Sequence, residues 1–114
     1  MTIVCNDDDV RKYNEAMGYE YNENIESPDV SLEDLAKSIE KRGGSDSDAT
    51  CQYILWQYAY TTNNKDDQRK YVDRLVNLNK EGIYVNNLIQ SPYSLPRMQE
   101  LTKETVDAET KGRG

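Results

Sequence analysis

Apolar residues near the start of the chain fall at helical spacing. They stand three and four positions apart, at Val10, Tyr13 and Met17. Asn6 or Asp7 is placed to cap this helix, and Gly18 is placed to end it in a left-handed conformation. The acidic triplet 7–9 suits the positive end of the helix dipole, which explains it without a metal ion.

A second helix has the clearest local signal in the sequence. Ser31 is the expected N-cap, Asp34 stands in for the Glu of a capping box, and Val30 and Leu35 form a hydrophobic staple. The apolar stripe is narrow, and it consists of Leu32, Leu35, Ala36 and Ile39. The pair Gly43–Gly44 is expected to end the helix.

The most apolar stretch is 49–60, whose periodicity does not separate helix from strand. Its Tyr and Trp content favours a strand. Its length, and the cap that Asp48 or Ser47 offers, favour a mostly buried helix, which is our prediction.

A plainer amphipathic helix follows, capped by Asn63 or Asn64 and closed by Gly82. With 49–60 it predicts an antiparallel helical hairpin over 49–82. Residues 83–90 fit either a helical turn or an edge strand, and 19–30 is interpreted as a loop. Ser94 and Pro96 open a last helix over 94–108, before a frayed tail at 109–114.

These elements predict a single, mainly α-helical domain over residues 1–114, with four to five helices and a central antiparallel hairpin. One short strand pair stays open as an alternative. The chain has no run of about 18 apolar residues, so we expect no membrane span, and no signal-peptide pattern follows Met1. The expected location is the cytoplasm.

Composition adds an asymmetry of charge. The net charge is -7, and residues 1–48 hold 13 acidic against 5 basic side chains. Such a half repels phosphate backbones and anionic lipid, so we expect no direct nucleic-acid or membrane binding and a protein partner with a basic surface. The simpler interpretation is that these acids keep a small protein soluble.

Candidate chemistry is sparse. The sequence has no His, the commonest general base and metal ligand. Cys5 and Cys51 form no C-x-x-C pair and are predicted to be separate reduced thiols, with Cys51 buried and inert rather than a nucleophile. The carboxylate clusters lie at expected helix starts and match no EF-hand loop. We therefore predict no catalytic residue, no metal site and no cofactor.

Tyrosine is the unusual component, with nine residues against no Phe. We expect some of them at the surface, where Tyr often dominates protein interfaces, although Tyr also serves as a core residue in place of Phe. The predicted partner-binding residues lie in loop-like segments, with nearby acids for a basic partner, and they are Tyr19, Glu20, Tyr21, Glu23, Glu26, Tyr84 and Tyr93.

Taken together, these features predict a small acidic, non-enzymatic interaction factor, a regulator or inhibitor that docks on a partner protein and has the option of forming a homo-oligomer. Short acidic chains of this kind are often encoded by viruses or mobile elements, which is an association only. The main alternative is a DNA mimic, in which acids of the first two helices imitate phosphates. An enzyme that uses Cys51 or paired carboxylates is the third class.

Overall fold

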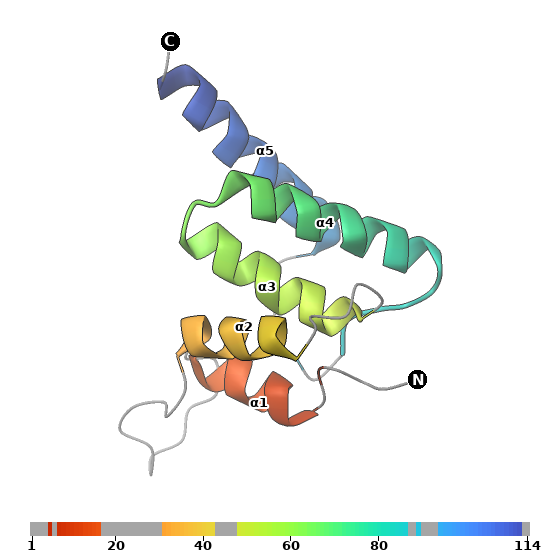
Figure 1. Ribbon diagram of the computed structural model, residues 1–114. Coiled ribbons are helices and arrows are strands. Elements are labelled where there is room, and N and C mark those ends of the chain that lie inside the picture. Colours follow the sequence, from red (N-terminus) through yellow and green to blue (C-terminus); the bar gives the residue numbers. More distant parts are fainter. Residues whose placement is uncertain are drawn as a thin grey trace.

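The computed structural model describes residues 5, 7–16, 31–42, 48–86, 89 and 94–112, the side chains of 109–112 excepted. Within these ranges the chain is mainly α-helical and contains no strand (Figure 1). The helices are α1 (Asp7–Ala16), α2 (Leu32–Lys41), α3 (Ala49–Thr61), α4 (Lys65–Lys80) and α5 (Leu95–Gly112). The predicted fold class, a small helical domain, is confirmed.

Local capping chemistry sets three of the helix starts as the sequence predicts. The Ser31 hydroxyl accepts from the Asp34 amide at 3.1 Å, Asp48 accepts from two amides of the first turn of α3, and Asn64 accepts from the Asp67 amide. Each cap satisfies amides that the helix itself leaves unpaired. The expected helix ends at Gly18 and Gly43–Gly44, and the staple residue Val30, lie outside the described residues.

The stretch 49–60 is a helix, as predicted, and it is the centre of the molecule. Ten of the thirteen residues of α3 are buried, so the helix has no polar face. Figure 1 shows α2 beside α3 on one side and α4, running in the opposite direction, on the other. Neighbours on both sides explain why a chain with few aliphatic residues still forms a core.

Polar side chains join the helices inside this core. The ring N–H of Trp56 in α3 donates to the Thr102 hydroxyl of α5 at 2.9 Å, and the ring stacks on Tyr60.

The helix α5 continues to Gly112, four residues past the predicted end at 108. Of the four added residues, Glu109 and Lys111 are good helix formers and Thr110 and Gly112 are poor ones, so helix propensity by itself does not account for the extension.

The phenol of Tyr71 links α4 to α2 and resists ionisation. It donates to Glu40 at 3.5 Å, and burial, followed by the charges of Asp67 and Glu40, raises the pKa of Tyr71 to about 12. This pKa exceeds the value of about 10 in the unfolded chain, so the folded protein binds the phenol proton more tightly. The protonated phenol therefore stabilises the folded protein at neutral pH, and this stabilisation is lost as the pH rises from about 10 to 12.

We therefore expect wild-type protein to lose more unfolding free energy than Tyr71→Phe between about pH 9 and pH 11. Urea unfolding at the two pH values measures the difference. Every other titratable group is the same in both proteins, so parallel losses would contradict the assignment to Tyr71.

Candidate docking surface

Two large apolar side chains stand in solvent just after α4. Ile83 is 37% exposed and Tyr84 is 68% exposed, and they are the large hydrophobic side chains that the described part of the chain leaves exposed. Adjacent exposed apolar residues are a common sign of a binding site, because soluble monomeric proteins usually expose apolar side chains singly rather than in patches.

The chain holds these residues through a turn at one end and a side-chain anchor at the other. Gly82 takes a φ of 82°, a left-handed conformation that glycine adopts without strain, and the Ile83 amide donates back to the Leu78 carbonyl at 2.9 Å. At the other end, the Asn86 amide donates to the Thr50 hydroxyl at 2.9 Å. We name residues 83–86 the docking segment.

The docking segment forms one wall of a hollow of about 160 Å³ between the start of α3, the end of α4 and the start of α5. Its apolar lining includes Tyr53, Leu75, Ile83, Val85, Leu95 and Met98. We name it the docking hollow. An apolar hollow of this size accommodates a group as large as benzene.

The predicted contact residues have different outcomes. Tyr84 is the most exposed large hydrophobic side chain described, and it borders the docking hollow. Outside the described residues lie the other six, Tyr19, Glu20, Tyr21, Glu23, Glu26 and Tyr93. Sequence reasoning missed Ile83, which it placed in an ambiguous element. The signal that could have found it is Gly82, since a residue that follows a helix-ending glycine leaves the helix surface.

Several other tyrosines belong to the core instead. Tyr13, Tyr53 and Tyr71 are at most 5% exposed. The Tyr13 hydroxyl lies 3.4 Å from that of Tyr53 and 3.3 Å from the Gln57 amide oxygen, so α1 meets α3 through polar contacts inside the core. At these three positions Tyr replaces the missing Phe, with its hydroxyl partnered.

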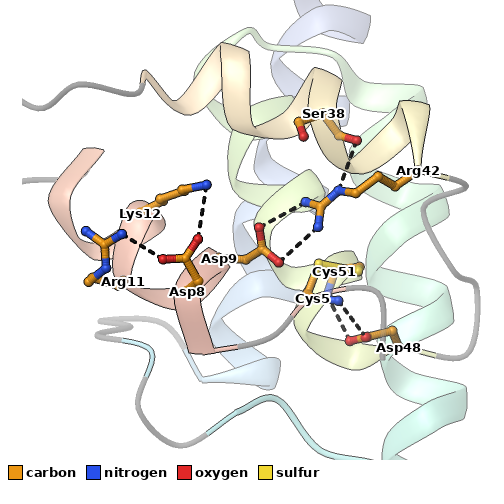
Figure 2. Close-up of polar contacts among 9 residues, drawn as sticks. All are labelled: Cys5, Asp8, Asp9, Arg11, Lys12, Ser38, Arg42, Asp48 and Cys51. Carbon is orange, nitrogen blue, oxygen red and sulfur yellow. Dashed lines mark hydrogen bonds and ion pairs between the residues drawn. A yellow bond between two sulfur atoms is a disulfide. The ribbon is translucent and has the colours of Figure 1, made fainter. Parts of the chain in front are cut away.

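Ion pairs inside the protein engage carboxylates of the acidic half (Figure 2). Arg42, after α2, donates to both carboxylate oxygens of the buried Asp9 of α1, at 2.9 and 3.1 Å. On the outer face of α1, Asp8 pairs with Arg11 and Lys12, whose hydrogen bonds lower the pKa of that carboxyl. Asp9 therefore contributes to the packing of α1 on α2 rather than to a free negative surface.

The excess acidity lies mostly outside α1 and α2. These two helices and Arg42 hold seven acidic against five basic side chains, and the other six acids of residues 1–48 lie in the segments between and after them. Glu33 of α2 also pairs with Lys37. A DNA mimic needs a row of carboxylates that face solvent without a basic neighbour. The basic side chains on α1 and α2 leave fewer carboxylates of that kind.

The two cysteines form a disulfide, so the prediction of separate reduced thiols is wrong. Cys5, two residues before α1, is bonded to Cys51 in the first turn of α3, with Cα atoms 5.6 Å apart (Figure 2). Both are buried, as was expected for Cys51. Sequence reasoning failed here because a separation of 46 residues carries no information about distance in space.

Asp48 organises the surroundings of this disulfide. One carboxylate oxygen caps α3 by accepting from the Thr50 and Cys51 amides, and the other accepts from the Cys5 amide at 3.1 Å. The two sulfurs and this carboxylate lie within 4.8 Å of one another, a grouping that can also hold a metal ion. In the disulfide form neither sulfur is a thiolate and the carboxylate already accepts three N–H groups, so the geometry fits a cross-link better than a metal centre.

No family model matches the chain, nor does any curated protein or solved structure. Among the described helices, none combines the length and apolar character needed to cross a membrane. Function is therefore inferred from the surface geometry.

Proposed function

We propose that this protein is a non-enzymatic docking factor that binds a protein partner through the docking segment and the docking hollow. The observation that carries the proposal is the exposure of Ile83 and Tyr84 at the rim of an apolar hollow. Binding rather than catalysis is favoured because the sequence has no His and both thiols are consumed in the disulfide.

The hollow sets the size of the group that the partner inserts. A volume of about 160 Å³ suits one large apolar or aromatic side chain. Tyr84, standing beside the opening, adds a rigid aromatic surface that covers the inserted group and excludes water. Few residues of this type usually contribute most of the free energy of an interface.

Charge selects the partner that carries this group. With a net charge of -7, the protein attracts basic surfaces and repels acidic ones, which raises the rate of correct encounters. Glu81, the residue that caps the end of α4, is exposed near the docking segment. The expected partner segment therefore has an apolar anchor flanked by Lys or Arg.

Two features favour docking of this kind over DNA mimicry. Asp8, Asp9 and Glu33 are engaged in ion pairs within the protein. The docking hollow, in contrast, is apolar. A protein that fills a DNA-binding cleft by imitating phosphates needs no apolar hollow. DNA mimicry also predicts that affinity for the partner falls steeply as the salt concentration rises. Binding through an inserted apolar anchor should keep most of its affinity at high salt.

The disulfide indicates the kind of compartment in which the protein acts. Disulfides persist in oxidising compartments and are rare in the cytosol. The expectation of a cytoplasmic location assumed reduced thiols, and the Cys5–Cys51 bond favours an oxidising environment instead. We therefore propose that the protein binds its partner in an oxidising compartment.

Selection from a random peptide library tests the proposed partner chemistry. Immobilised wild-type protein is expected to enrich peptides with one Trp, Phe, Leu or Met flanked by Lys or Arg. The same selection on an Ile83→Ser/Tyr84→Ser variant should lose that enrichment, because both rim side chains are exposed and their removal leaves the core intact.

Thr61→Ala is the matched control, since Thr61 is exposed at the opposite end of α3. It should enrich the same peptides as wild type. Equal enrichment by the double variant, or peptides that are basic without an apolar anchor, would contradict docking at this hollow. Self-association through the same residues would appear in sedimentation as a dimer that the double variant does not form, and would contradict a basic partner.

A further inference from the structure

The disulfide and the docking segment meet at one point of the fold. Asn86, the last residue of the docking segment, binds a residue near each cysteine. Its amide N–H donates to the hydroxyl of Thr50, which precedes Cys51, and its side-chain amide donates to the carboxylate of Asp7, two residues after Cys5, at 2.8 Å. Asn86 therefore bridges the two chain segments that the disulfide joins.

The opposite end of the docking segment does not depend on this bridge. The turn at Gly82 and the hydrogen bond from Ile83 to Leu78 belong to the end of α4. Of the two anchors, only the one at Asn86 requires α1 and the start of α3 to stay together. The position of Tyr84, which lies between the anchors, requires both.

The disulfide fixes the segment just before α1 to the first turn of α3. It closes a loop that contains α1 and α2, and Asp48 adds its hydrogen bond to Cys5 at the same place. Without the cross-link, the segment before α1 gains freedom to move, and Asp7 separates from Thr50 in a fraction of the molecules. Asn86 then loses its hydrogen bond to Asp7, and its amide hydrogen bond to Thr50 opens more often.

We propose that oxidation of Cys5 and Cys51 switches on the docking site, an inference that rests on the proposed function. In the reduced protein the docking segment keeps its anchor at α4, whereas its anchor at Asn86 is weakened. One cysteine thiolate attacks a sulfur of a disulfide donor, such as glutathione disulfide, which breaks the donor S–S bond, releases one glutathione thiolate and leaves a mixed disulfide on the protein. The second cysteine thiolate then displaces the donor thiol. The protein loses two electrons and two protons, and the donor is reduced to two thiols.

Burial makes the oxidised state persistent. Cys5 is 3% exposed and Cys51 is inaccessible, so a reducing thiol reaches the bond only after local opening of the chain. The docking site thus forms in an oxidising compartment and survives brief contact with reductant.

Amide hydrogen exchange in glutathione buffers tests the coupling without any partner. In the reduced protein we expect the Asn86 amide to exchange about tenfold faster or more than in the oxidised protein. The Trp56 ring N–H, bonded to Thr102 in the α3–α5 core, exchanges through global unfolding, so in the reduced protein it should stay better protected than the Asn86 amide. Thr50→Val removes the acceptor for Asn86 and leaves both cysteines in place, so it should give fast Asn86 exchange in both buffers.

Three outcomes would overturn the switch. Asn86 exchange that is equal in both buffers means that the disulfide does not hold the segment. Equal protection of the Asn86 amide and the Trp56 ring N–H in the reduced protein means that both exchange only through global unfolding and that the bond is a general stabiliser. Equal affinity of the reduced and oxidised proteins for a library-selected peptide means that the coupling has no effect on docking. A peptide that binds the Ile83→Ser/Tyr84→Ser variant as tightly as oxidised wild type overturns the docking site instead, which separates the two failures.

Discussion

Urea unfolding of the Cys5→Ala variant is expected to show a loss of about 4 kcal/mol in unfolding free energy relative to oxidised wild type. The cross-link closes a loop between residues 46 positions apart, and closing such a loop removes conformational entropy mainly from the unfolded chain. A change of this size shifts the urea midpoint by about 2 M or more.

Reduction provides the matched control for this prediction. Oxidised wild type should unfold at a higher urea concentration than reduced wild type, and reductant should leave the midpoint of Cys5→Ala unchanged. Wild-type curves that coincide with and without reductant would show that the bond contributes no stability.

Replacement of Trp56 by Ala should cost about 3–5 kcal/mol, the range for removing a large aromatic side chain from a core. Trp56 is fully buried, stacks on Tyr60 and donates its ring N–H to Thr102, so the change removes contacts with both α3 and α5. Because this is the only Trp, unfolding is followed by far-UV circular dichroism.

Thr102→Val separates the hydrogen bond from the packing. It keeps the volume near the ring but removes the Thr102 hydroxyl that accepts from the indole N–H, at a cost of about 1–3 kcal/mol. A cost below about 1 kcal/mol for Trp56→Ala would contradict the placement of α3 at the centre of the core.

Local signals in the sequence were enough to predict the helices. Ser31, Asp48 and Asn64 act within three residues of themselves, so their capping roles follow from the sequence without knowledge of the fold. The apolar stretch 49–60 was harder, because period and residue type disagreed. Its length and its cap indicated the correct structure.

Contacts between distant residues could not be predicted in the same way. The Asp9–Arg42 pair, the Cys5–Cys51 bond and the bridge from Asn86 to Asp7 each join residues more than 30 positions apart. No spacing rule specifies such pairs, because they depend on how the helices pack. Of the candidate docking site, sequence composition indicated Tyr84, whereas the hollow beside it exists only in the folded chain.

The central claim is that Ile83 and Tyr84 bind the apolar anchor of a basic partner. Calorimetric titration of a library-selected peptide into oxidised wild type, Thr61→Ala and the Ile83→Ser/Tyr84→Ser variant tests it most directly. We expect wild type and Thr61→Ala to bind alike, and the double variant to bind about 30-fold or more weaker, since a single interface hot spot contributes about 2 kcal/mol or more. Equal affinity of all three proteins would contradict the claim.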